Sequence, residues 1–445
     1  MPSDSPPGGN ESAESLEKSS VRGTMWTLAG HGGGQALRLG SNLILTRLLA
    51  PEYFGQMVLV NVSLMALQLM SDVGIGPSII HHKRGDDRDF LDTAWTLQVI
   101  RGFILWGSAV ALAWPVAWLY GQPDLITLLP VAAVSALLSG FQSTAQFSLS
   151  RHLSLAKVTL LELSRQFFGV LVMVVWAWHA PSIWALIAGG IVGAATQTAI
   201  SHFLIPGPRN RFRWEPEARD DILRFGKWIF ISTALGFLAN RGDRLILGKV
   251  MTMEELGLLS VALVLAQNVG NLINDIGRKV LFPAYARLAD QGDENLRRGM
   301  LKARAALLAG SLPILAVLVV YGDLIVGLLW DERYSDAGPM LQILAAGRIF
   351  GAINSTSTPV MLAKGDGRSH AFNSAARLAL LLGCAAVGGH HGGTVGVLVG
   401  TSASSLAYYP ILAWRVRKYG VWMPGLDLLA TLCTGALIAL GFALR

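Results

Sequence analysis

Long apolar runs recur along almost the whole chain, and they constrain the fold more than any other feature of the sequence. Runs of about 18 or more residues can cross a hydrocarbon core roughly 30 Å thick. The 445 residues are 52% hydrophobic and only 15% charged, and the mean hydropathy is positive. Segments of alternating polarity, which transmembrane strands would need, are not seen. We therefore predict an all-α polytopic membrane protein whose backbone groups are satisfied inside helices.

The apolar runs divide the chain into thirteen predicted helices that follow a polar N-terminal segment. Residues 1–22 are rich in Ser, Pro, Gly and Glu, a composition typical of a disordered tail. We expect an N-terminal six-helix lobe at 23–206, a basic linker at 207–223, a C-terminal six-helix lobe at 224–414 and one further helix within 415–445. The predicted helices cover residues 24–47, 54–76, 94–120, 125–149, 156–178, 183–205, 224–248, 256–277, 304–329, 337–361, 370–389, 394–413 and 425–444.

The basic residues lie almost entirely on one side of the predicted helices. If the N-terminal tail is cytoplasmic, 25 Lys and Arg residues fall on that side, including those from Arg278 to Arg304, and four fall on the other side. Such an excess is the positive-inside pattern of a multi-pass protein. The net charge of +7 is therefore explained by topology and by anionic membrane lipids, and it does not indicate a nucleic-acid partner.

The sequence also repeats itself at an offset of 202 residues. Because each half would hold six helices, an even number, both halves enter the membrane from the same side and form a parallel repeat. Two such bundles that face each other would form a central cavity open alternately to either side. The matched positions are Trp26 and Trp228, Leu43–Leu45 and Leu245–Leu247, Arg47 and Lys249, Glu52 and Glu254, and Gly55 and Gly257.

Seven arginines lie within the predicted helices, where each costs on the order of 2.5 to 3.5 kcal/mol near a helix centre. Arg101, Arg244 and Arg377 are close enough to helix ends for their side chains to reach the interface. Arg165 follows Glu162 by three residues and is expected to pair with it.

The other three arginines need a different explanation. Arg38 and Arg348 lie near helix centres without a carboxylate at helical spacing, and Arg241 is intermediate in depth. An arginine that faced lipid at such a depth would have no partner, so we expect these three to line a polar cavity.

Two motifs at the start of the chain resemble the polysaccharide transporter family, the Wzx-type oligosaccharide flippases. These are "RLLAPEYFG", at the turn between the first two predicted helices, and "DVGIGPSII", at the end of the second. The resemblance extends over roughly residues 22–415. It implies the superfamily of multidrug, oligosaccharidyl-lipid and polysaccharide exporters, whose members have two six-helix lobes. Twelve or fourteen helices are usual there, so a thirteenth helix is a departure.

The resemblance further implies a function. Members of this family move an undecaprenyl-diphosphate-linked oligosaccharide to the outer leaflet of the bacterial cytoplasmic membrane. Arginine suits a diphosphate because its planar guanidinium forms charge-assisted, often bidentate hydrogen bonds. The expected partners are the lipid-linked glycan, membrane lipids and other proteins of polysaccharide assembly. The candidate substrate-binding residues are Arg38, Arg348, Arg241, Gln35 and Asn42.

Energy coupling has three candidate residues, and the sequence offers no catalytic machinery. Asp72, Asp243 and Asp275 are candidates for ion coupling, although helix capping is a common role for such residues near helix ends. We find no Walker A pattern, no pairing of nucleophile and base, and no metal-ligand spacing. We therefore expect a protein that is not an enzyme and that needs no cofactor or metal.

Two other functions are compatible with a polytopic chain of this kind. A cation-coupled multidrug exporter shares the superfamily fold, but a cavity for cationic drugs should hold buried carboxylates rather than arginines. A membrane polysaccharide polymerase or ligase would need a large outward loop for its chemistry. The charge within the predicted helices is mainly arginine and the predicted outward loops are short, so both alternatives are less favoured than glycan export.

Overall fold

The computed structural model describes residues 30, 32–70, 74–151, 155–203, 210–224, 246–276, 281, 285, 293–357, 360–361 and 366–443. The chain divides into two compact units, one from residues 1–49 and 63–234 and the other from residues 50–62 and 235–445. Five of the described helices are long and apolar enough to cross a membrane, or six if the bent pair α5 (Leu125–Gly140) and α6 (Ala145–Arg151) forms one span.

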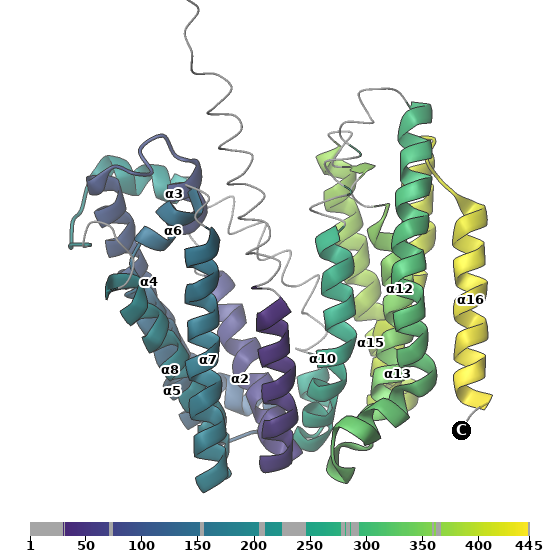
Figure 1. Ribbon diagram of the computed structural model, residues 1–445, viewed down its shortest axis with the longest axis horizontal. Coiled ribbons are helices and arrows are strands. Elements are labelled where there is room, and N and C mark those ends of the chain that lie inside the picture. Colours follow the sequence, from purple (N-terminus) through teal and green to yellow (C-terminus); the bar gives the residue numbers. More distant parts are fainter. Residues whose placement is uncertain are drawn as a thin grey trace, which may run out of the picture. The chain divides into compact units, whose positions relative to one another are not determined.

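The first unit consists of helices that cover most of the predicted N-terminal spans (Figure 1). The predicted helix 54–76 is not continuous, because Gly74, directly before α3 (Ile75–His81), has a left-handed backbone conformation. The helix α2 (Pro51–Met70) contributes its residues 63–70 to this unit. The other elements are a helix over residues 32–48, α3 (Ile75–His81), α4 (Arg88–Tyr120), α5 (Leu125–Gly140), α6 (Ala145–Arg151), α7 (Leu155–His179), α8 (Ile183–Phe203) and a helix over 216–224.

The predicted helix 125–149 is bent by 62° between α5 and α6. Side chains from α4 satisfy the carbonyl groups that the bend leaves without helical partners. Gln98 Nε2 donates to the backbone oxygens of Gly140 and Gln142, and Trp95 Nε1 donates to that of Phe141. Since unpaired carbonyls at a helix end are costly when buried, these bonds stabilise the break.

The second unit contains the remaining helices, and two of them differ from the predicted spans. α12 begins at Asp293 rather than near residue 304, so it is longer than a membrane crossing requires. α15 includes both predicted helices 370–389 and 394–413, with non-helical backbone at Gly392 and Gly393 between them. The elements are residues 51–62 of α2, a helical stretch over 246–250, α10 (Met253–Ile276), α12 (Asp293–Leu329), η2 (Glu332–Tyr334), α13 (Ala337–Ser355), α15 (Gly367–Arg417) and α16 (Pro424–Ala443).

Closely packed glycines join the last two helices of each predicted lobe. In the first unit, α7 and α8 touch where Gly169 faces Gly189, and Gly193 lies against the backbone of Arg165. These contacts use a G-x-x-x-G pattern, which allows close approach of membrane helices. A Cβ atom at Gly189 would overlap its neighbours, so the helices could not approach as closely.

The second unit has the same arrangement between the two parts of α15. Gly388 faces Gly396, and Gly400 lies against the backbone of Cys384. Gly396 and Gly400 again form a G-x-x-x-G pattern, and both follow Gly189 and Gly193 by 207 residues. The two halves of the chain therefore use the same packing device at corresponding places.

Candidate functional site

Three predicted site residues lie on one face of the helix over residues 32–48. Gln35, Arg38 and Asn42 are spaced by three and four residues, which places them along one stripe. Arg38 is exposed, whereas Gln35 and Asn42 are half-buried. Gln35 Oε1 is buried and has no hydrogen-bond donor among the described residues. The stripe can therefore offer a cation and amide groups to a polar ligand.

The helix that carries this stripe packs against α7 near the start of the helix. Gln166 Nε2 donates to the backbone oxygen of Gly34 at 2.8 Å, and Gly30 lies directly against Thr159. The glycine-rich segment before Gln35 thus removes side chains where α7 approaches. This contact fixes the rotation of the helix, and with it the direction of the polar stripe.

Arg348 is half-buried in the second unit, on α13 where this helix packs against α10. Its guanidinium lies along Gly270 of α10. A Cβ atom at Gly270 would be 3.3 Å from Nη1 of Arg348, which is tighter than ordinary contact. Gly270 therefore leaves room for the arginine, and a larger residue there would move it.

The other predicted site residues cannot be located in the same way. Arg241, Asp72 and Asp243 lie outside the described residues. Asp275 lies on α10, but its side chain is outside the described part. The roles of these residues in cargo contact and in ion coupling stay predictions.

Two of the arginines that we expected to reach an interface or to pair locally have other partners. Arg101 Nη2 donates to the backbone oxygen of Gln68, at the end of α2, at 2.9 Å. The expected pair of Arg165 with Glu162 is wrong, because Arg165 Nη1 instead lies 3.4 Å from Oε1 of Gln197 on α8. Contacts between helices have replaced a contact within one helix.

A buried charge cluster that the sequence did not predict surrounds Arg304. We counted Arg304 among the cytoplasmic loop residues, but it lies within α12 with only 1% of its surface exposed. Its guanidinium forms an ion pair with Asp427 in the first turn of α16 and donates to the backbone oxygen of Ile353. The Tyr409 hydroxyl also donates to Asp427, at 2.6 Å. No local pattern indicates this pair, because its members are more than one hundred residues apart.

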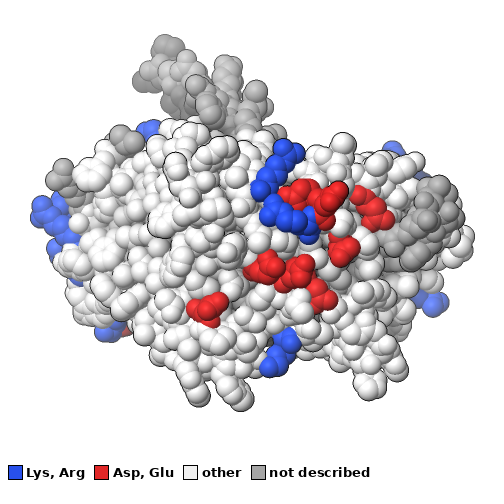
Figure 2. All heavy atoms as spheres, turned by 90° about the horizontal axis from the view of Figure 1, so that it is seen from below, with Lys and Arg blue, Asp and Glu red and all other residues white. Residues whose placement is uncertain are grey.

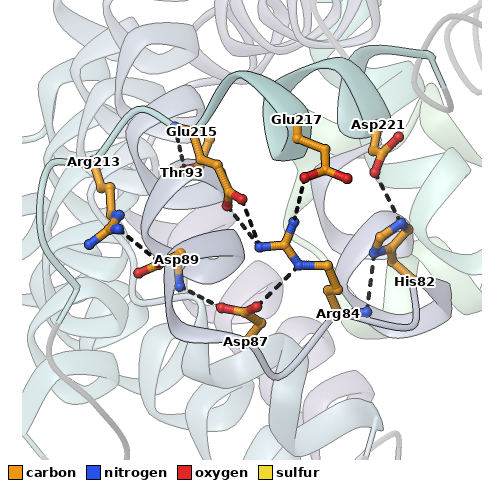
Figure 3. A network of polar contacts seen from close by, with 9 residues as sticks. All are labelled: His82, Arg84, Asp87, Asp89, Thr93, Arg213, Glu215, Glu217 and Asp221. Atoms are coloured by element: carbon orange, nitrogen blue, oxygen red, sulfur yellow. Dashed lines mark hydrogen bonds and ion pairs between the residues drawn. The ribbon is translucent and has the colours of Figure 1, made fainter.

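The predicted basic linker folds onto the first unit through a network of polar contacts (Figure 3). Arg84 Nη2 donates to both carboxylate oxygens of Glu215, at 2.8 and 2.9 Å. These bonds raise the pKa of Arg84 above its ordinary value. The backbone N–H of Asp89 donates to Asp87 and is the main reason why the pKa of Asp87 is lowered. His82 lies 3.3 Å from Asp221, which extends the network along the linker.

An apolar core lies beneath this network. Ala218 and Ile222, on the helix over 216–224, are buried against Ile79, Phe90 and Leu91 of the first unit. The spacing of these two residues gives the linker helix one apolar face. Residues 210–224, the part of this segment that the structure describes, therefore pack as part of the first unit.

At the end of the second unit where α2 and α10 begin, acidic and basic side chains gather within a mostly uncharged surface (Figure 2). Arg333 and Asp331 form an ion pair, with 2.6 Å between Nη2 and Oδ2, and the adjacent Tyr334 packs on Phe54 of α2. Thr252 and Glu255 form a capping box at the start of α10, in which each side chain accepts from the other's backbone N–H. These contacts satisfy exposed helix ends and are explained as structural.

Comparison with solved structures shows the class of protein. The chain has the fold of an inward-facing multidrug resistance MATE family transporter of the MOP superfamily, with a TM-score of 0.69 and 14% identity over 87% of this chain and 95% of that chain. It matches the lipid II flippase MurJ, in an inward closed conformation, equally well, with a TM-score of 0.69 and 12% identity over 89% of this chain and 87% of that chain. The protein is thus an all-helical, polytopic membrane protein with this fold.

Residues 44–339 match the model of a family described as "Polysaccharide biosynthesis protein". This chain belongs to that family. It is 25% identical to the lipopolysaccharide biosynthesis protein WzxC of Escherichia coli (strain K12) over 97% of this chain and 89% of that protein. It is 21% identical to the succinoglycan biosynthesis transport protein ExoT of Rhizobium meliloti (strain 1021) over 79% of this chain and 70% of that protein. The resemblance to Wzx-type proteins drawn from the sequence is confirmed.

Proposed function

We propose that this protein is a flippase that moves an undecaprenyl-diphosphate-linked oligosaccharide from the cytoplasmic to the outer leaflet of the bacterial cytoplasmic membrane. Membership of the polysaccharide biosynthesis family, matched over 44–339, is the observation that carries the proposal. The fold it shares with a lipid II flippase is consistent with a lipid-linked cargo. In this proposal the N-terminus is cytoplasmic, as the distribution of basic residues favours.

Transport would use the two six-helix lobes, 23–206 and 224–414, as parallel repeats around a central cavity that opens alternately to each side. Arg38, Arg348 and Arg241 would bind the diphosphate, and Gln35 and Asn42 would bind sugar hydroxyls. The polar stripe supports these roles because it presents Arg38 exposed beside the buried, unpartnered Oε1 of Gln35. Charge-assisted hydrogen bonds would replace the water that the diphosphate loses.

The membrane potential can help to drive this movement. An anion that moves outward across an inside-negative membrane gains about 2.3 kcal/mol per charge per 100 mV if it crosses the full field. Asp72, Asp243 and Asp275 remain the proposed residues for coupling to a proton or another cation. Other proteins of polysaccharide assembly would supply and remove the cargo.

The experiment compares arginine variants in cells that lack the native gene. Arg38→Ala and Arg348→Ala should abolish surface polysaccharide while the amount of membrane-inserted protein stays normal. Lysine at either position should restore export only in part, because an ammonium lacks the bidentate geometry of a guanidinium. Arg377→Ala is a matched control, since Arg377 also lies within a long helix but is expected to reach the interface.

Normal surface polysaccharide in both alanine variants would show that the arginines do not hold the cargo. Multidrug export is the second candidate, because a multidrug transporter shares the fold. Drug susceptibility should therefore be measured in the same strains. If the arginine variants lost drug resistance while surface polysaccharide was unchanged, drug export would replace glycan export as the proposed function.

A further inference from the structure

The segment over residues 210–215, which we term the linker strap, is held across the start of α4 by its backbone. The N–H groups of Arg211 and Arg213 donate to Asp92 Oδ1 and Thr96 Oγ1, at 3.0 and 3.1 Å. The N–H of Glu215 donates to Thr93 Oγ1 at 3.1 Å. Every second N–H of the strap is therefore fixed to α4, which leaves the side chains between and beside them at the surface.

The exposed side chains of the linker strap alternate between basic and aromatic. Residues Arg211 to Trp214 read "RFRW", and all four are exposed. Phe212 is 69% exposed and Trp214 50% exposed, although both are large and apolar. Exposed apolar groups of this size beside cations indicate a surface that another phase or molecule covers.

The depth of the strap can be read along the membrane helices of the first unit. The Phe212 ring lies 4.8 Å from that of Trp95 on α4, so the strap lies at the level of residue 95. Exposed tryptophans occur at the opposite end of the same helix, at Trp114 and at Trp118, which is 75% exposed. Trp95 and Trp114 are 19 residues apart, about 29 Å along a helix.

Two further helices give the same spacing. On α8, Trp184 and Phe203 are both exposed, Phe203 by 81%, and they are again 19 residues apart. On α7, the exposed Trp176 follows the exposed Lys157 by 19 residues. Each spacing corresponds to about 29 Å, close to the roughly 30 Å of a hydrocarbon core. Tryptophan gathers at both interfaces of a bilayer and lysine can reach the headgroups, so the exposed Trp114, Trp184, Trp176 and Lys157 mark its two boundaries.

We propose that the linker strap is a lipid-binding element in the headgroup layer of the membrane, at the end of the first unit where α4 begins. Phe212 and Trp214 lie at the boundary between headgroups and acyl chains. Arg211 and the exposed part of Arg213 contact the phosphates of anionic phospholipids. Alternation of basic and aromatic side chains matches this chemistry, because the rings favour the interface and the guanidinium groups favour phosphate.

The strap is thus fixed on two sides, by α4 and by lipid. The connection between the predicted lobes is then anchored to the first unit and to the bilayer up to residue 224. This inference depends on the protein spanning a membrane, and it does not depend on what the protein transports. Its failure and the failure of the proposed function are therefore separable.

The depth of the strap can be measured in the full chain, reconstituted in vesicles. Nitroxide labels are attached to Phe212→Cys, Trp214→Cys and the control Glu217→Cys, in a background with Cys384→Ser and Cys433→Ser. Glu217 belongs to the same linker and its side chain is exposed. We expect labels at 212 and 214 to collide more with oxygen than with a water-soluble nickel chelate. The label at 217 should collide more with the nickel chelate than with oxygen.

The lipid chemistry is tested by thermal unfolding of the parent protein in two kinds of vesicle. Replacing about one third of the phosphatidylcholine by phosphatidylglycerol should raise the midpoint temperature of thermal unfolding. High salt should reduce this increase, since salt screens the surface charge. The double variant Arg211→Gln and Arg213→Gln should lose most of this shift, whereas Arg298→Gln, an exposed arginine of the second unit, should keep it.

Nickel accessibility at 212 and 214 equal to that at 217 would overturn the proposal, because the strap would then face water. It would leave the strap as a docking surface for a soluble protein. An equal phosphatidylglycerol shift in the double variant would overturn the assignment of the arginines to lipid phosphate.

Discussion

Arg304 of α12 and Asp427 of α16 form a buried ion pair that connects the last helix of the chain to the rest of the second unit. Arg304 also donates to the backbone oxygen of Ile353, near the end of α13. In the first unit, neutral donors from α4 satisfy the carbonyls at the break after α5. Because an arginine takes this role in the second unit, its charge needs a partner, and α16 supplies one.

Removal of one member of this pair should destabilise the protein strongly. Asp427→Asn leaves a buried, unpaired guanidinium, for which a cost of about 3 to 5 kcal/mol is expected. Unfolding in mild detergent, followed by denaturant titration, should show this loss. The double variant Arg304→Met and Asp427→Leu should recover most of it, since both charges are removed together.

An exposed pair provides the matched control. Glu294→Gln breaks the surface pair of Glu294 with Arg298 and should change stability by less than about 1 kcal/mol. If Asp427→Asn unfolded no more easily than Glu294→Gln, the buried pair would not be what holds α16 in place.

Two glycines at the starts of α2 and α10 should not tolerate a side chain. Within the second unit, Gly55 lies against the backbone of Met253 and Gly257 lies against that of Pro51, and both pairs are related by 202 residues. A Cβ atom at either glycine would overlap a backbone carbonyl. We expect Gly55→Ala and Gly257→Ala each to cost about 1 to 3 kcal/mol of unfolding free energy.

A glycine with free space around it gives the comparison. A Cβ atom added to Gly310, on α12, would have no neighbour within 4 Å. Gly310→Ala should be neutral or stabilise by up to about 1 kcal/mol, because alanine favours helix more than glycine does. Equal effects at Gly55 and Gly310 would mean that the close contact of α2 with α10 is not important for stability.

The start of α15 should lose stability in acid. Asp366 caps this helix and accepts hydrogen bonds from Tyr419 and from Ser369, the Tyr419 hydroxyl being the largest cause of its strongly lowered pKa. Because its folded pKa lies below its unfolded value of about 3.9, the contribution to stability is present above about pH 4 and is lost as the pH falls further.

Thermal unfolding measured from neutral pH down to about pH 3 tests this sign. Asp366→Asn should be less stable than the parent at neutral pH, and the difference should shrink in acid. Tyr419→Phe should show a smaller pH dependence than the parent, because one bond to the carboxylate is lost. A constant difference between Asp366→Asn and the parent across this range would contradict the assignment.

A change at Gly270 should weaken transport through Arg348 without touching the arginine itself. Gly270→Val places methyl groups where the guanidinium now lies and should move it. If the proposed function holds, surface polysaccharide should fall by a factor of about 10, equivalent to 1.4 kcal/mol of lost interaction. Gly310→Val serves as the control and should leave export unchanged.

The sequence by itself determined the helical, membrane-spanning class and the positions of most helices. A chain in lipid must satisfy its backbone within helices, so the length of each apolar run already limits the possible structures. It also determined the family, since the turn motif "RLLAPEYFG" is a local signal that needs no knowledge of packing. Gly189 and Gly193 were equally visible as a G-x-x-x-G pattern, although their role in packing α8 on α7 was not inferred.

Only the tertiary structure decided which charged side chains meet. Arg304 was assigned to a loop because α12 extends beyond the apolar run, and its partner Asp427 comes from a distant helix. Arg165 prefers Gln197 across a helix contact to Glu162 along its own helix. The linker was recognised as basic, but its fixation to α4 depends on hydrogen bonds across more than one hundred residues. The local spacing of apolar residues determines where helices form. The partners of long charged side chains depend on which residues lie close in the folded protein, and no local sequence pattern contains this information.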